Sequence, residues 1–180
     1  MQLTADLMKS ALTSLDILLN QEKDNPADVT LIIGGGGAML LAHHFTLATS
    51  DIDAVPRGIE MSQLDPFIKR VAMELGLAPD WLNPYFATFS HTLPSDYGTR
   101  LIPVFQGKRI KALALGKEEM LIMKCFAHRQ KDVGHAKALI KAGADHAKVG
   151  DHIESLLKKK IPGAQQALDF LDDVLDQVGG

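Results

Sequence analysis

The sequence is short of cysteine and of long apolar runs, and both shortages narrow the kinds of protein it can encode. Its 180 residues include a single cysteine, Cys125, which excludes an intrachain disulfide. Because Cys125 stands in the apolar pattern EEMLIMKCFAHR with no dedicated base nearby, we expect a buried thiol rather than a catalytic one. No apolar run reaches the roughly 18 residues of a membrane span, and the first residues lack a secretory signal pattern. We therefore expect a cytoplasmic protein with no membrane partner.

Two familiar nucleotide-binding motifs are also missing, although four consecutive glycines occupy positions 34–37. A phosphate loop needs Gly-x4-Gly-Lys-Ser/Thr, and no such lysine follows these glycines. The dinucleotide pattern Gly-x-Gly-x-x-Gly meets Met39 or Leu40 where its third glycine should stand. Both motifs are excluded, so the glycines need another explanation.

The composition suits one globular domain or a compact pair of small lobes, with 46% hydrophobic and 23% charged residues. The net charge of −3 is unevenly distributed. Residues 100–160 contain 14 Lys and Arg against 6 Asp and Glu, whereas the rest contains 5 against 16. This asymmetry is typical of a basic lobe that meets phosphate or nucleic acid, and equally of solvated lysines on helix faces.

Hydrophobic periodicity in the first half predicts alternating helices and strands. We expect helices over 3–22 and 62–76, the latter ending at Gly76, and strands over 29–33 and 50–55. The glycine run reads as a turn that opens into a helix reaching Phe45. The Pro-rich and aromatic segment 77–98 has little periodicity, which indicates a long ordered loop with short helical turns.

The second half changes from strands to helices near residue 116. Residues 100–105 and 109–115 predict an antiparallel hairpin, and four helical patterns follow from Lys117. The fold class is therefore α+β, with an α/β core over 1–116 and a C-terminal helical lobe over 117–180 that we expect to pack against it.

The sequence SDIDAV follows the predicted glycine turn and its helix. Asp51 and Asp53 stand at i and i+2 of a predicted strand, which places both carboxylates on one face and Ile52 on the other. Paired carboxylates are costly unless a cation lies between them, and Mg²⁺ suits such a pair. The glycine turn offers free amides to a phosphate. The alternative is that Asp51 caps a turn and Asp53 faces solvent.

A strand ending in Gly-Gly, a helix and then Ser/Thr-x-Asp-x-Asp or Ser-Asp-x-Asp resembles the start of the nucleotidyltransferase superfamily with the polymerase-β-like fold. The resemblance implies a minimal nucleotidyltransferase fold, a small mixed sheet flanked by helices. It also implies that Asp51 and Asp53 hold Mg²⁺ and that Gly35, Gly36 and Ser50 contact the nucleotide. Which two of the four glycines correspond stays open.

A second motif, Lys-x4-Arg-x-Lys-Asp, comprises Lys124, Arg129, Lys131 and Asp132. It resembles a helix of the AbiEii-type nucleotidyltransferases, which include toxins of type IV toxin-antitoxin systems, and PDWLN at 79–83 looks like a segment of their small relatives. The resemblance implies catalytic roles for Lys124 and Asp132. Lys124 would neutralise triphosphate charge and Asp132 would serve acid/base work or orientation, with Arg129 and Lys131 as further nucleotide contacts. The alternative is a set of surface ion pairs.

The chain departs from the family in one respect. Many members carry a third carboxylate on a later strand, but IKALAL at 110–115 contains no acid, and Glu118 and Glu119 are expected to begin the next helix. We expect a Mg²⁺-dependent enzyme that transfers a nucleotidyl group from a nucleoside triphosphate to an acceptor hydroxyl on RNA or protein. A toxin role with a cognate antitoxin follows by resemblance alone. The alternative is a catalytically inactive module that binds nucleic acid or protein.

Other residues favour structural roles. The seven histidines form no HExxH arrangement typical of zinc, and the lysines at 158–160 suit a helix end better than an RNA contact. A group of aromatic residues either stacks a base or, as we expect more often of such clusters, fills a small core. It consists of Trp81, Tyr85, Phe86 and Phe89.

Overall fold

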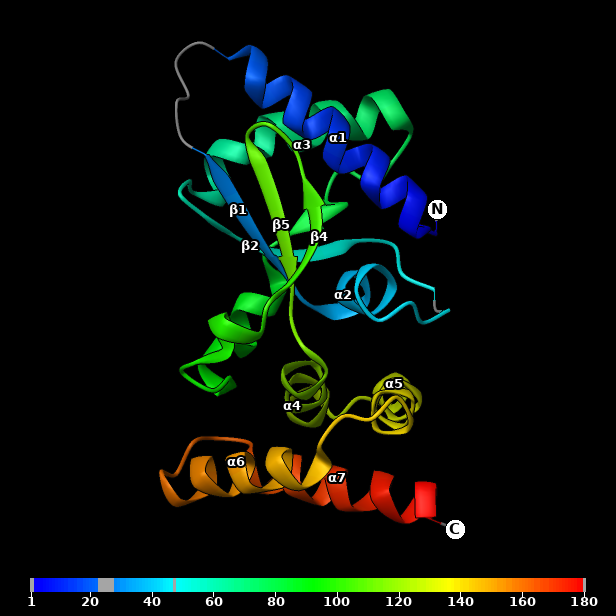
Figure 1. Cartoon of the computed structure of the whole chain (residues 1–180), viewed down its shortest axis with the longest axis vertical. Coiled ribbons are helices and arrows are strands. Elements are labelled where there is room, and N and C mark those ends of the chain that lie inside the picture. Colours follow the sequence, from blue (N-terminus) through cyan, green and yellow to red (C-terminus); the bar gives the residue numbers. More distant parts are fainter. Residues whose placement is uncertain (1, 23–27, 47, 180) are drawn as a thin grey trace. The chain divides into compact units, whose positions relative to one another are not determined.

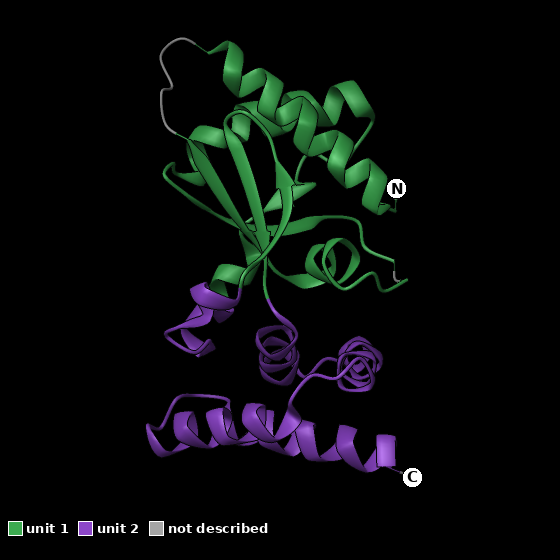
Figure 2. Ribbon diagram, in the orientation of Figure 1, with its two compact units in different colours: residues 1–88, 101–115 green, residues 89–100, 116–180 purple. Residues whose placement is uncertain are grey.

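The computed structural model describes residues 2–22, 28–46 and 48–179. The chain forms two compact units, shown in different colours in Figure 2: unit 1 contains residues 1–88 and 101–115, and unit 2 contains residues 89–100 and 116–180. Each unit has its own buried core. No helix of the described residues is long and apolar enough to cross a membrane.

Unit 1 is built on a five-stranded mixed sheet in the order β3-β2-β1-β5-β4 (Figure 1). The central strand β1 is antiparallel to β2 and parallel to β5; β3 is parallel to β2, and β4 is antiparallel to β5. Four of the five residues of β1 are buried, as expected of a central strand that is covered on both faces. The strands are β1 (Val29–Ile33), β2 (Ile52–Arg57), β3 (Leu82–Asn83), β4 (Ile102–Gln106) and β5 (Ile110–Ala114).

Three helices belong to unit 1: α1 (Ala5–Gln21), α2 (Gly35–Leu41) and α3 (Met61–Leu75). α1 packs against α3 (Figure 1) and is tied to the β4–β5 hairpin by Asp16. The buried carboxylate of Asp16 accepts hydrogen bonds from the backbone N–H groups of Lys108, Arg109 and Ile110 at 2.7 to 2.9 Å. This carboxylate therefore supplies an acceptor to three consecutive backbone amides of the hairpin.

Unit 2 contains α4 (Lys117–Ala127), α5 (Gln130–Lys141), α6 (His146–Lys158) and α7 (Ala164–Gly179). α4 packs against the other three helices, and its residues 119–126 are all buried. Glu118 and Glu119 lie in its first turn, as the sequence predicts. The burial of Cys125 inside this helix confirms the expected buried thiol, and burial raises the pKa of that thiol to about 12.

The predicted α+β fold class and small mixed sheet are confirmed, and three local predictions are corrected. Segment 77–98 contains 3-10 turns over Tyr85–Thr92 and Tyr97–Arg100, which confirms the predicted short helical turns, but it also contains β3, which was not predicted. A two-residue strand is too short to give a periodic pattern. The predicted glycine turn is the first turn of α2, and α2 ends at Leu41 rather than Phe45. Asp51 lies one residue before β2 instead of inside it.

Candidate functional site

The two aspartates of SDIDAV lie where the chain enters β2, at half-buried positions. Ile52 between them is fully buried, so the alternation of a strand directs Asp51 and Asp53 away from the core that Ile52 enters. Asp53 is paired in register with Asn83 of β3, and the Asn83 side chain also reaches Asp51. Asp51, Asp53 and Asn83 therefore share one face of the sheet.

Two of the four glycines lie directly against this segment. Gly35 has φ +56°, a left-handed conformation that favours glycine, and a Cβ there would collide with the Asp53 carboxylate. A Cβ at Gly36 would lie 2.7 Å from the Thr49 hydroxyl oxygen. A Cβ at Gly37 would instead face the apolar side chains of Ile33 and Ile52 at 3.2 and 3.3 Å. Gly35 and Gly36 thus border the aspartates, whereas Gly37 borders the core.

Asp51 is held by two neighbours that the sequence reasoning did not select. The Thr49 hydroxyl donates to Asp51 Oδ1 at 3.2 Å, and Asn83 Nδ2 donates to Asp51 Oδ2 at 2.9 Å. Both could have been found in the sequence: Thr49 begins the pattern Thr-x-Asp-x-Asp over 49–53, and Asn83 is the final residue of PDWLN. Ser50, the predicted nucleotide contact, is exposed. Asp51 is therefore an oriented carboxylate rather than a simple turn cap.

The donor set at this place fits Mg²⁺. Carboxylate oxygens are its preferred protein ligands, and it commonly takes one or two of them and completes its shell with water and phosphate oxygens. Each Asp51 oxygen that accepts one hydrogen bond retains a lone pair for a cation. Among the described residues no group of three or more His, Cys, Asp or Glu side chains could hold a metal. A cation held by Asp51 and Asp53 would take its remaining ligands from water and substrate.

The first turn of α2 supplies the other half of the site. Gly34 N–H donates to the Asp53 carbonyl at 2.9 Å, which fixes the glycine run beside β2. The amides of Gly35, Gly36 and Gly37 are in the first turn, where a helix offers them no internal acceptor. Free amides beside paired carboxylates suit a phosphate that brings its own cation.

The Lys-x4-Arg-x-Lys-Asp residues lie in unit 2, and three of the four converge. Lys124 Nζ, from the last turn of α4, donates to Asp132 Oδ1 at 2.8 Å, and Arg129 Nε donates to Asp132 Oδ2 at 2.6 Å. Asp132 is fully buried and Lys124 is 5% exposed, so this is a buried ion pair and not a surface one. Lys131 is exposed. His135 Nδ1 lies 3.8 Å from Asp132 Oδ1, beyond hydrogen-bond length.

The electrostatics of Asp132 follow from these neighbours. Burial raises the pKa of a carboxyl, but the contacts with His135, Arg129 and Lys124 outweigh burial and hold the pKa of Asp132 well below its usual range. Asp132 is therefore a permanent anion at neutral pH. Its charge holds the Lys124 ammonium in place. That ammonium has three N–H donors and uses one of them in the bond to Asp132.

A second buried carboxylate lies in unit 2. Glu119 is 1% exposed, and its Oε1 accepts from Arg100 Nη2 at 2.7 Å. Its Oε2 is buried with no hydrogen-bond partner among the described residues. Arg100 also pairs with Asp96 at 2.8 Å, and the carboxylate neighbours raise the pKa of the guanidinium. The same segment also contacts α6, because the Thr92 carbonyl lies 2.8 Å from His152 Nε2. Segment 89–100 is therefore anchored to α4 through Arg100 and to α6 through Thr92.

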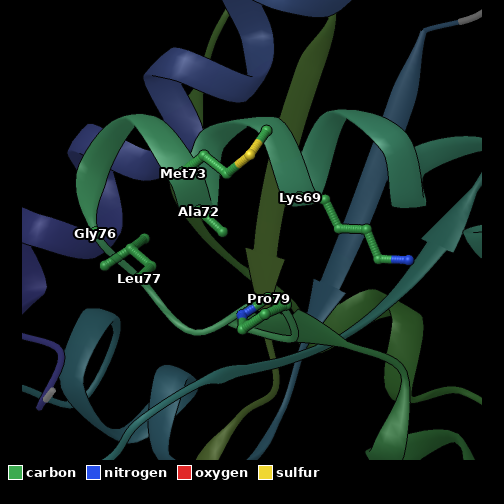
Figure 3. A pocket seen from close by; sticks show the side chains of 6 residues that line it. All are labelled: Lys69, Ala72, Met73, Gly76, Leu77 and Pro79. Carbon is green, nitrogen blue, oxygen red and sulfur yellow. The ribbon is translucent and has the colours of Figure 1, made fainter.

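A pocket of about 600 Å³ lies at the end of α3 and the loop that follows it (Figure 3). Its lining is mainly apolar and carries one charged side chain, Lys69, whose ammonium pairs with Asp65 at 2.7 Å. None of the predicted site residues lines it. Of the aromatic group, Trp81 and Phe86 are buried and Tyr85 is 60% exposed, so only part of this cluster fills the core.

A family model described as "Nucleotidyltransferase of unknown function (DUF6036)" matches residues 10–143, about three quarters of the chain. The chain belongs to this family. The matched range includes the glycine run, both aspartates and Asn83 in unit 1, and Lys124 and Asp132 in unit 2. Searches among curated proteins and among solved structures gave no match.

Membership of a nucleotidyltransferase family implies a nucleotide as substrate, and the mixed sheet flanked by helices is consistent with a minimal nucleotidyltransferase fold. Unit 1 contains the aspartates and the glycine run, and unit 2 contains the cluster of Lys124, Arg129 and Asp132. β5, where a third carboxylate was sought, contains Lys111 and apolar residues only.

Proposed function

We propose that the protein is a Mg²⁺-dependent nucleotidyltransferase of the cytoplasm that binds a nucleoside triphosphate and transfers a nucleotidyl group to an acceptor hydroxyl on RNA or protein. The observation that carries the proposal is the contact between the glycine run and the paired aspartates. Gly35 lies against Asp53, and Gly36 lies against Thr49, which binds Asp51. Mg²⁺ bound by Asp51 and Asp53 supplies charge neutralisation at the phosphate oxygens.

The other roles in nucleotide binding and transfer are assigned to residues of the chain. The Gly35 and Gly36 backbone approaches the phosphates, and no side chain blocks that approach. The Lys124 ammonium offsets negative charge as the acceptor oxygen bonds to the α-phosphorus and the bond to the departing pyrophosphate breaks. Arg129 and Lys131 add positive charge for nucleotide binding. Of the two roles open to Asp132, orientation of Lys124 is favoured, because a carboxylate with so low a pKa is a poor proton carrier.

Calorimetric titration with each nucleoside triphosphate in the presence of Mg²⁺ tests this proposal. The wild-type protein should bind at least one of them, and D51N and D53N should each lose that binding. T88V is a control, because Thr88 is exposed and its Oγ1 donates to the Tyr85 carbonyl in the same turn. Equal binding by wild type, D51N and D53N would exclude the metal site.

A second candidate, a catalytically inactive binding module, is favoured by one observation: β5 carries no carboxylate. Incubation with labelled triphosphates and total RNA separates the two. Transferred label supports the enzyme, whereas salt-sensitive RNA binding without transfer supports the module.

We further propose a toxin-like role of the AbiEii type, supported by the resemblance of the Lys124 to Asp132 motif. Expression in a bacterial host should arrest growth, and co-expression of a neighbouring gene product as cognate antitoxin should relieve the arrest. D51N should remove the arrest if transfer causes it. Arrest by D51N equal to that of wild type would separate toxicity from transfer.

A further inference from the structure

Asn83 stands 32 positions after Asp51 in the chain, yet its hydrogen bond to the Asp51 carboxylate is shorter than that of Thr49. Nδ2 donates to Asp51 Oδ2 at 2.9 Å and lies 3.3 Å from the Asp80 carbonyl. Oδ1 accepts from the Tyr85 backbone N–H at 3.0 Å. Every polar atom of the Asn83 amide is therefore used.

These partners allow only one orientation of the amide. If it were turned over, Oδ1 would face the Asp51 carboxylate and Nδ2 would face the Tyr85 N–H, placing acceptor against acceptor and donor against donor. The orientation is thus set by the backbone at Tyr85, and the donor must point at Asp51.

The strand that carries Asn83 is short but firmly anchored. Trp81 is fully buried, its indole N–H donates to the Ile68 carbonyl at 3.0 Å, and its own carbonyl accepts from Ile52 N–H at 2.6 Å. Leu82 and Asn83 then pair with Ile52 and Asp53. The position of Asn83 is consequently fixed from the core outward, on the strand next to the aspartates.

We propose that Asn83 is a positioning residue of the metal site, which holds the Asp51 carboxylate in the orientation that binds a divalent cation. The inference rests on the proposed function. Asn83 and Thr49 bind one oxygen each, which stops rotation of the carboxylate about its Cβ–Cγ bond. Both neighbours are neutral, so they orient the carboxylate without cancelling the charge that attracts the cation. Such supporting contacts typically change metal affinity about 10- to 100-fold when removed.

Mn²⁺ titration, followed by calorimetry and by the electron paramagnetic resonance signal of free Mn²⁺, measures this contribution without turnover. N83A should weaken Mn²⁺ binding about 10- to 100-fold, whereas T88V, which changes a hydroxyl in the adjacent turn, should leave it unchanged. N83L, which keeps the approximate shape of asparagine and lacks the donor, should match N83A. Thermal unfolding of each variant verifies that the fold is retained.

The double variant D51N/N83A decides whether Asn83 acts through Asp51. If it does, N83A should cause no further loss of Mn²⁺ affinity once Asp51 is asparagine. Wild-type Mn²⁺ affinity in N83A and N83L, or an equal loss from N83A with and without D51N, would overturn the proposal while leaving the metal site intact. Wild-type affinity in D51N and D53N themselves would instead overturn the proposed function.

Discussion

Asp51 in unit 1 and Asp132 in unit 2 are the same residue type but have opposite surroundings. Asp132 is fully buried and contacts Lys124 and Arg129, so its charge is balanced inside the protein. Asp51 is half-buried, and its carboxylate accepts hydrogen bonds from the neutral side chains of Thr49 and Asn83. The comparison indicates that the neighbours of a carboxylate, and not its residue type, decide whether it can attract a cation from solution. A carboxylate with neutral neighbours can do so, whereas one paired with lysine and arginine cannot.

The strongest test of this contrast is removal of the buried anion. D132A should lower the free energy of unfolding by about 3–5 kcal/mol, because it leaves the buried Lys124 ammonium without its partner. Chemical denaturation measures the change. D65A removes the partner of Lys69 in an exposed pair and should cost no more than about 1 kcal/mol. Equal losses in the two variants would contradict the distinction between balanced burial and surface pairing.

A smaller loss is expected from the glycine that borders Asp53. G35A forces a side chain into a left-handed backbone and against the Asp53 carboxylate, and it should destabilise the protein by roughly 1–3 kcal/mol. G134A is its matched control: Gly134 lies in α5 with nothing near its missing Cβ, and alanine there should stabilise by about 0.5–1 kcal/mol. Stabilisation in both variants would show that the close approach at Gly35 does not exist.

The pH dependence of stability should report the buried ion pairs of Asp132. Because the folded-state pKa of Asp132 is lowered, its contribution is complete above the ordinary Asp pKa of about 3.9 and is lost as the pH falls below it. The stability difference between wild type and D132N should thus be constant from pH 7 to about pH 5 and shrink in stronger acid. Urea titrations at each pH measure it, and a difference that grows in acid would reverse the assigned direction.

The smallest change in stability is expected at Asp51. D51N keeps the shape of the side chain and removes a charge whose hydrogen-bond donors are the neutral Thr49 and Asn83. The free energy of unfolding should therefore change by no more than about 0.5–1 kcal/mol, while Mn²⁺ binding weakens to an affinity that is measurable only at high Mn²⁺ concentration. Denaturation and Mn²⁺ titration of one preparation provide both readings. A loss of several kcal/mol would make Asp51 a structural residue like Asp132.

Much of the secondary structure and part of the site could be predicted from local pattern. The periodicity of the first helix, the apolar run of β1 and the spacing of Asp51 and Asp53 are all signals within a few residues. Asn83 could not be placed in this way, because its partner lies 32 residues earlier and β3 is only two residues long. The grouping of Thr92 and Arg100 with α6 and α4 depends on contacts 60 and 19 residues apart.

The sequence by itself determined which chemical groups are available: four glycines, an Asp-x-Asp pair and the Lys-x4-Arg-x-Lys-Asp motif. Each of these is local in the chain and can therefore be recognised from its spacing. Only the tertiary structure decided which of these groups can contact a ligand. Gly35 and Gly36 border the aspartates while Gly37 borders the core, and Asp132 pairs with Lys124 and Arg129 while Asp51 accepts from the neutral Thr49 and Asn83. The physical reason is that burial and pairing are set by residues distant in the chain, since a carboxylate has the same charge everywhere until its neighbours are in place.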